Sequence, residues 1–300
     1  MPKLDRFVIL VLAAALLPGC IKSMAVNALG DALSEPGGSF GRDDDPDFVC
    51  ESSPFGLKTI ESLLDAEPEH AGLHVAATRG FVQYGYACLQ LAADRVEERD
   101  YEAAKHLRAR AQGMYRRAVR YGLAGMNLVL ESKDPRAALR ADTDKALRRF
   151  EGEHVDLLYW TALAWAAGVS LDKDDIELAA DLGLVEPMMR RVEALAPNYE
   201  EGSIHDFFMT WEAAKPGGDP QVVEERLAKA LAASNDERLA PLVSYAEGPL
   251  VQRQDAAAFD ATLDRVLAFD LDRAPRHRLV NILAQRRAAW LKARRDDLFL

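Results

Sequence analysis

The chain has 300 residues, of which 49% are hydrophobic and 28% charged, and its formal net charge at pH 7 is −11. A chain of this length and apolar content can bury a sizeable core, as one long domain or as two. The acidic balance excludes nucleic acid as an expected partner, because phosphate binding needs a basic face.

The first twenty residues have the pattern of an export signal that ends at a cysteine. Lys3 and Arg6 form a short positive region, and the eleven apolar residues "FVILVLAAALL" follow at 7–17. A helix that crosses a bilayer needs about 20 apolar residues, so the stretch predicts a signal peptide, 1–19, and not a membrane span. The ending "LPGC" resembles a bacterial lipobox, in which Cys20 would become an acylated N-terminus. The alternative is an ordinary secretory signal with a bystander cysteine.

A lipid-modified Cys20 would hold the protein at a membrane surface, because several acyl chains together anchor a domain firmly. Ile21 and Lys22 follow the cysteine where inner-membrane lipoproteins usually have Asp, so we expect the periplasmic side of the outer membrane rather than the inner one. In that oxidising compartment Cys50 and Cys88 are able to form a disulfide. The alternative is two buried free thiols.

The chain after the anchor divides into a loop-rich segment, 20–47, and a helical domain, 48–300. Ala and Leu dominate the domain, no convincing alternation of period 2 is present, and apolar residues first recur with helical spacing at 57–64. These features predict an all-α fold. We expect the further helices at roughly 70–96, 100–121, 135–149, 154–169, 174–182, 186–195, 200–214, 220–233, 236–247, 256–269 and 276–295.

Helix ends show a recurring rhythm. Pro68, Pro197 and Pro275 each follow an amphipathic helix and precede another one. A helix, a short proline turn and an antiparallel helix make up the tetratricopeptide rhythm, here with an irregular period. We therefore expect cryptic, degenerate tetratricopeptide-like hairpins, whose stacking produces a concave binding surface. Asp134-Pro135 and Asp219-Pro220 each predict a capped helix start.

Motifs that could carry chemistry are weak. "GGSFG" matches the nucleophile elbow around Ser39, but it has no predicted strand before it. His70 and His74 stand one helical turn apart without a third metal ligand, so capping or packing explains them better. The acidic runs at 43–47 and 172–175 lack the spacing of a Ca²⁺ loop and fit acidic turns or helix starts. We expect no catalytic residues, no metal and no cofactor.

Aromatic residues on small-residue helices suggest a ligand cavity. Candidate lining residues are Tyr84, Trp160, Trp165 and Trp211, and the polar pair Asn281 and Gln285 lies beside the apolar seam of the last long helix. A groove with aromatic walls and a few polar groups describes a pocket for an apolar or amphipathic ligand. The alternative for each aromatic residue is ordinary core packing.

Strings spread over most of the mature chain carry a family resemblance: "SMAVNALGDALSEPGGSFGRDDDPD", "SPFGLKTIESLLDAEPEHAGL", "GFVQYGYA", "RAQGMYRRAVRYGL", "EGSIHDFF", "PGGDPQVVEERLAKAL", "FDATLDRVLAFD" and "RLVNILAQRRAAWLKARRDDLF". The sequence resembles the T component associated with TRAP-type transporters, the TatT family of periplasmic lipoproteins. Cys50 and Cys88 depart from the family pattern, which favours a disulfide specific to this chain.

The resemblance implies an all-α bundle of cryptic tetratricopeptide helix pairs that assembles as a homotrimer, with a cleft or pore through each subunit. It also implies a TRAP solute-binding protein as partner and a small hydrophobic ligand, such as a fatty-acid-like carboxylate. The first hypothesis is therefore a non-enzymatic, membrane-anchored accessory protein that docks the solute-binding protein and passes a ligand through a helix-lined cavity. The alternatives are a lipoprotein scaffold without cargo and, remotely, an envelope hydrolase that uses Ser39.

Overall fold

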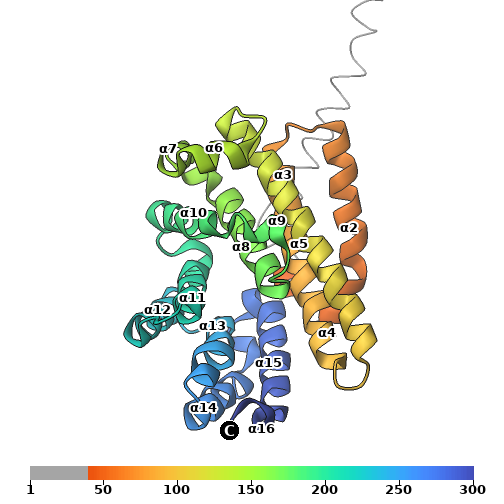
Figure 1. Cartoon of the computed structure of the whole chain (residues 1–300). Coiled ribbons are helices and arrows are strands. Elements are labelled where there is room, and N and C mark those ends of the chain that lie inside the picture. The colour runs from red at the N-terminus through yellow and green to blue at the C-terminus, as the bar shows by residue number, and fades with distance from the viewer. Residues whose placement is uncertain (1–39) are drawn as a thin grey trace, which may run out of the picture.

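The computed structural model describes residues 40–300, in which every regular element is helical (Figure 1). The predicted signal peptide, Cys20 and Ser39 lie outside these residues. The principal helices are α2 (Pro46–Ala66), α3 (Ala71–Tyr84), α4 (Leu91–Val96), α5 (Tyr101–Leu130), α6 (Pro135–Ala141), α7 (Thr143–Leu147), α8 (Val155–Leu171), α9 (Ile176–Ala179), α10 (Leu182–Leu195), α11 (Tyr199–Ala214), α12 (Pro220–Ala233), α13 (Ala240–Tyr245), α14 (Ala256–Leu267), α15 (Arg278–Ala293) and α16 (Arg295–Leu298).

Short elements join these helices. Two are π-helical segments, η2 (Gly85–Gln90) between α3 and α4 and η4 (Ala246–Leu250) after α13. The others are 3₁₀ turns, namely η1 (Phe40–Arg42), η3 (Gly152–His154), η5 (Leu271–Arg273) and η6 (Pro275–His277). The all-α prediction is confirmed, and within residues 40–300 no helix is long and apolar enough to cross a membrane.

Aspartate caps begin many of these helices. Asp134 accepts a hydrogen bond from the backbone N–H of Ala137 at 3.0 Å, and Asp219 accepts one from Gln221 at 2.8 Å. In both cases a proline occupies the first helical turn, where its missing N–H costs nothing. Both predicted helix starts are therefore confirmed.

Packing contacts run in a closed circuit around the molecule. In order, the contacting pairs are α2 with α3, α3 with α5, α5 with α8, α8 with α10, α10 with α11, α11 with α13, α13 with α15, and α15 with α2 (Figure 1). The N-terminal helices thus meet the C-terminal ones in two places, through α10–α11 and through α2–α15.

Two hydrophobic clusters support the circuit. The first extends from Leu57 to Phe208 and the second from Met209 to Leu291, so α11 contributes to both. Within the first cluster, Gly122 of α5 lies against α8. A Cβ atom at Gly122 would stand only 2.1 Å from the Thr161 hydroxyl, so these two helices approach as closely as they do because a glycine is present.

A disulfide within the N-terminal half and three ion pairs between the two ends of the chain add to these packing contacts. Cys50 of α2 is bonded to Cys88 of η2, with their Cα atoms 5.5 Å apart. Where α15 reaches the N-terminal helices, the guanidinium–carboxylate distances are 3.1, 2.8 and 3.2 Å in the pairs Arg286–Asp47, Arg287–Asp94 and Arg294–Glu98. These ion pairs lie beside the packing contacts of α15 with η1 and α2.

Candidate functional site

The aromatic residues predicted to line a cavity belong to the first hydrophobic cluster. Trp165 is fully buried and Trp160 is 8% exposed, and neither indole N–H has an acceptor. Trp211 is half-buried, stacks on Phe207 at 5.5 Å and donates its indole N–H to Glu186 at 3.1 Å. Tyr84 packs at the edge of the same cluster.

The predicted polar pair lies in the other half of the molecule and bonds to backbone groups. The Asn281 side chain is fully buried, accepts from the Leu239 N–H at 3.0 Å and donates to the Glu237 carbonyl at 2.8 Å. Gln285 donates to the carbonyl oxygens that end α14, those of Val266 and Phe269. The structure therefore does not gather the six candidate residues around one cavity.

The two histidines pack and cap, as expected. His70 caps α3 by accepting the Leu73 N–H at 3.2 Å. His74 is 5% exposed and bonds the Pro68 carbonyl at 2.8 Å through Nε2. Of the acidic runs, Asp45 caps α2, whereas Asp175 is a buried cap of α9 that also bonds Gln112 and Arg116. Both aspartates thus stand at helix starts, as predicted for these acidic runs, and Asp175 is in addition buried.

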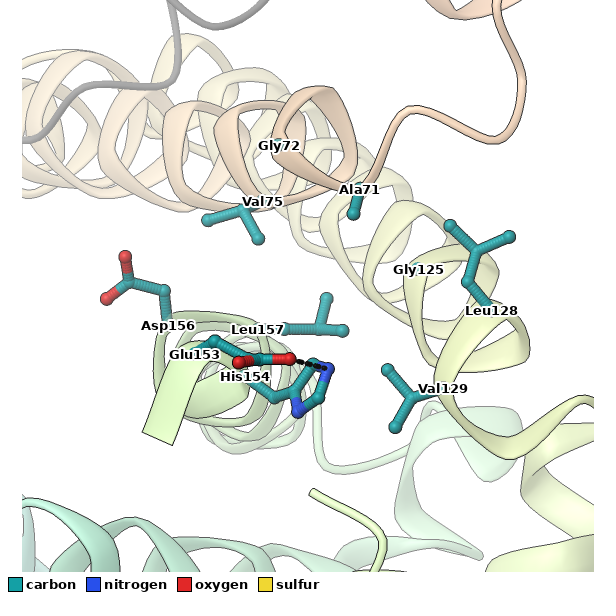
Figure 2. Close-up of a pocket in the computed structure, with 10 residues that line it drawn as sticks. All are labelled: Ala71, Gly72, Val75, Gly125, Leu128, Val129, Glu153, His154, Asp156 and Leu157. Atoms are coloured by element: carbon teal, nitrogen blue, oxygen red, sulfur yellow. Dashed lines mark ion pairs between the residues drawn. The ribbon is translucent and has the colours of Figure 1, made fainter. Parts of the chain in front are cut away.

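A surface groove of about 340 Å³ lies where the first turns of α3 and α8 meet the end of α5 (Figure 2). Its apolar wall and its floor, which includes two glycines, are formed by Ala71, Gly72, Val75, Gly125, Leu128, Val129 and Leu157. At one end stand Glu153, His154 and Asp156, and the Glu153 carboxylate lies 3.7 Å from the His154 ring (Figure 2). The groove therefore has an apolar wall with an acidic end.

A strained turn lies next to the acidic end of the groove. The Tyr199 hydroxyl donates to Asp156. Directly after it, Glu200 and Glu201 have φ angles of 48° and 51°, a left-handed conformation that costs a non-glycine residue about 1–2 kcal/mol. The following Gly202 has φ 94°, and a Cβ there would stand 2.7 Å from the carbonyl oxygen of Ala230. Strained backbone of this kind occurs often at functional sites.

Behind this turn lies a group of polar side chains that we call the central cluster: Tyr86, Tyr159, Asp206, Arg238, Glu247 and Arg287. They come from η2, α8, α11, the α12–α13 loop, η4 and α15, so elements from both halves of the circuit contribute. Arg238 donates to the Ser203 hydroxyl at 2.5 Å and to the Glu200 carbonyl. Arg287 donates to both oxygens of Glu247 and, at 2.8 Å, to Asp94.

Two exposed residues at or next to the central cluster have raised pKa values. The Tyr86 side chain is 45% exposed, yet burial raises the pKa of its hydroxyl to about 12, with Glu247 and Asp206 adding to the shift. Glu200 is likewise exposed, and burial raises the pKa of its carboxyl.

The cluster contains the most perturbed carboxyl of its surroundings. Burial raises the pKa of Asp206 to about 6, against the opposing effects of Arg238 and Ser244. Its Oδ2 accepts from the Ser244 hydroxyl at 3.4 Å, and its Oδ1 is buried without a donor. Buried polar atoms nearly always have a partner, and this oxygen is one of several buried side-chain atoms in the described residues that lack one.

Sequence reasoning missed both the groove and the cluster. The π-helical segments η2 and η4 supply Tyr86 and Glu247, and π-bulges are found frequently at functional sites. A π-segment adds a single wide turn of i→i+5 hydrogen bonds to an otherwise α-helical stretch, which is too short to be recognised from apolar spacing. The nearest available signal was the string "GFVQYGYA", which contains Tyr86 and was noticed only for its family resemblance.

Two comparisons with known proteins find similarity over most of the chain. Residues 42–299 match the family described as TRAP transporter T-component. An uncharacterized protein of Treponema pallidum (strain Nichols) is 32% identical over 273 residues, an alignment that covers 87% of this chain and 82% of that protein. The match covers both hydrophobic clusters and every residue of the central cluster. The chain therefore belongs to the TRAP transporter T-component family.

Proposed function

We propose that this protein is a membrane-anchored periplasmic accessory component of a TRAP-type transporter, which docks a solute-binding protein and passes a small hydrophobic ligand through its interior. The observation that carries the proposal is the family match over 42–299, because this family has an accessory role in TRAP transport. The surface groove with its apolar wall supports a site for a small hydrophobic ligand.

The groove and the central cluster suit the two ends of such a ligand. Val75, Leu128, Val129 and Leu157 offer an apolar wall for its body. Asp156 ends that wall and accepts from Tyr199, and the next residue, Glu200, accepts from Arg238 of the central cluster.

The test is to mix the purified full-length protein with its cognate TRAP solute-binding protein and to measure the assembly mass by light scattering. A solute-binding protein of the unrelated ABC-transporter class serves as the control partner. We expect a complex with the first and none with the second, and native mass spectrometry should find a small molecule in the protein or in the complex. Absence of both the complex and the ligand would refute the proposal.

The same measurements separate the alternative, a tetratricopeptide-like lipoprotein scaffold that recruits envelope proteins without cargo. A complex that forms without any small molecule, even after loading with candidate ligands, would favour the scaffold. The mass of the free protein also tests the homotrimer that we propose on the family resemblance. A monomer mass at micromolar concentration would contradict the trimer and would leave the docking result unaffected.

The proposed anchor has its own test. Cys20→Ser should abolish incorporation of palmitate and release the protein from the membrane fraction, whereas the wild type should fractionate with the outer membrane. The described residues contain no spanning helix, so a membrane-bound Cys20→Ser variant would refute the lipid anchor as the means of attachment.

A further inference from the structure

We propose that the outward face of α5 docks a carboxylate-rich surface of a protein partner, which in the proposed function is the TRAP solute-binding protein. This inference rests on the proposed docking role and names the surface and the chemistry through which docking takes place. We call this surface the basic face, and it consists of Lys58, Tyr84, Arg110, Gly113, Met114, Arg117, Arg120 and Tyr121.

The charge of α5 is opposite to that of the whole protein. The chain has a formal net charge of −11, but the only carboxylate in α5 is Glu102 in its first turn. Arg110, Arg117 and Arg120 follow one another at spacings of seven and three residues, so they share one side of the helix, and all three are at least partly exposed. The basic face therefore concentrates positive charge on an acidic protein.

Contacts between α2, α3 and α5 make the basic face continuous. Nη2 of Arg110 lies 3.5 Å from the Tyr84 hydroxyl of α3. The guanidinium of Arg120 stands 5.2 Å from the centroid of the Tyr121 ring, and the Tyr121 hydroxyl donates to Glu61 of α2 at 2.8 Å. The face thus extends from α3 across α5 to α2.

The carboxylate of Glu61 lies beneath the face and does not cancel its outward charge. Lys58 Nζ and Arg117 Nη1 lie 2.5 and 3.3 Å from the Glu61 oxygens. The Glu61 side chain is only 10% exposed, whereas those of Lys58 and Arg117 are 70% and 40% exposed. Among residues 40–300, no carboxylate pairs with Arg110 or Arg120. A partner that approaches this surface therefore meets cations.

The side-chain types favour a protein surface over a lipid surface as the occupant. The cores of protein interfaces are enriched in Arg, Tyr and Met and depleted in Lys. The basic face has three arginines, and beside them Tyr84, Met114 and Tyr121 are partly buried against the first hydrophobic cluster. A guanidinium also matches the two oxygens of a carboxylate with two parallel hydrogen bonds. Gly113, one turn from two of these arginines, has nothing within 4 Å of its Cβ position and leaves room for a partner side chain.

The experiment measures how fast the full-length protein, in a non-ionic detergent, associates with its cognate solute-binding protein at 50 and 500 mM NaCl. Complementary charges speed association at low salt, and salt screens exposed charges. We therefore expect association at 50 mM to be about tenfold faster, or more, than at 500 mM. Arg110→Glu/Arg120→Glu should slow association at 50 mM about tenfold or more and should remove most of its dependence on salt.

A matched control separates the basic face from the net charge. Arg148→Glu/Lys229→Glu makes the same change in charge at exposed positions after α7 and in α12, and should change the association rate less than about twofold. An equal loss in the control, or an unchanged rate in Arg110→Glu/Arg120→Glu, would overturn the inference. Circular dichroism checks folding, and Arg110→Gln/Arg120→Gln, which should slow association about threefold, provides the answer if the charge reversal does not fold.

A probe of defined chemistry tests the basic face without the partner. A fluorescein-labelled hexaglutamate peptide is titrated with the full-length protein at 50 mM NaCl and followed by fluorescence anisotropy. We expect binding that Arg110→Glu/Arg120→Glu weakens about fivefold or more. Absence of binding, or binding that the variant leaves unchanged, would overturn the inference. Phosphatidylglycerol added to the detergent micelles should not displace the peptide, and displacement would assign the face to a lipid surface and overturn the inference as well.

The outcomes are distinguishable from those of the proposed function. A complex with the solute-binding protein whose formation does not depend on the basic face would overturn the inference and leave the docking role intact. Absence of any complex would refute the docking role, and the peptide titration would still decide whether the face recognises carboxylates.

Discussion

Replacing both bridge cysteines, in the variant Cys50→Ala/Cys88→Ala, should destabilise the protein through the unfolded state. The bridge joins residues 38 positions apart. In the chain-entropy model, closing a loop of that length removes about 13 cal/mol/K of entropy from the unfolded chain, or about 4 kcal/mol at 25 °C. For a domain of this size, 4 kcal/mol corresponds to a fall in melting temperature of about 8–16 °C.

The assay is urea denaturation of the oxidised wild type and the double variant, followed by circular dichroism. A thiol count on the unfolded, unreduced wild type comes first, and it should find no free thiol at Cys50 or Cys88. Two free thiols there would contradict the bridge itself. A loss of stability below about 1 kcal/mol would refute the argument from loop entropy, since the bridge would then constrain little of the unfolded chain.

Three further predictions concern packing, buried polar groups and pH. Gly122→Ala should destabilise the protein by about 1–3 kcal/mol through its clash with α8, whereas Gly113→Ala on the same helix, with nothing within 4 Å, should stabilise it slightly; equal effects in thermal melts would contradict the packing argument. Asn281→Ala leaves a buried N–H and a buried carbonyl without their partner and should cost about 2–4 kcal/mol in urea denaturation, against a near-zero effect of Gln83→Ala at an exposed position. Burial raises the pKa of Asp206 to about 6, above its unfolded value of about 3.9, so its ionisation destabilises the fold by up to about 3 kcal/mol above pH 6 and not below about pH 4. Asp206→Asn should therefore raise the melting temperature at pH 8 and leave it unchanged at pH 4, and a gain of the same size at both pH values would exclude the carboxylate as its cause.

Most helices could be predicted from the sequence because helix caps and apolar spacing depend only on residues close together in the chain. Caps such as Asp134 and Asp219 need only the next few residues to work, and the apolar spacing of α2 identifies its buried face. The predicted helix at 100–121 stopped too early, since α5 continues to Leu130. The continuation contains Gly122 and Gly125, which resemble a stop signal but serve close contacts with α8 and α3.

The site could not be predicted because it depends on contacts between distant segments. Asn281 and Gln285 were correctly recognised as polar groups beside an apolar seam, but the backbone groups that they bond belong to other helices. The sequence does not distinguish a tryptophan in a hydrophobic core from one in a cavity wall. The structure places both Trp160 and Trp165 in the first hydrophobic cluster. Asp206 attracts no notice in "EGSIHDFF", because only the folded circuit deprives it of water.

High salt weakens the three ion pairs between α15 and the N-terminal helices to different degrees. Its outer pairs are open to solvent, with the side chains of Asp47 and Glu98 at 70% and 64% exposure, and at 1 M salt the screening length is only about 3 Å. The inner pair persists, because the side chains of Arg287 and Asp94 are 10% and 14% exposed. Raising the salt concentration should therefore weaken the outer ion pairs of this junction first and leave Arg287–Asp94 as its salt-resistant centre.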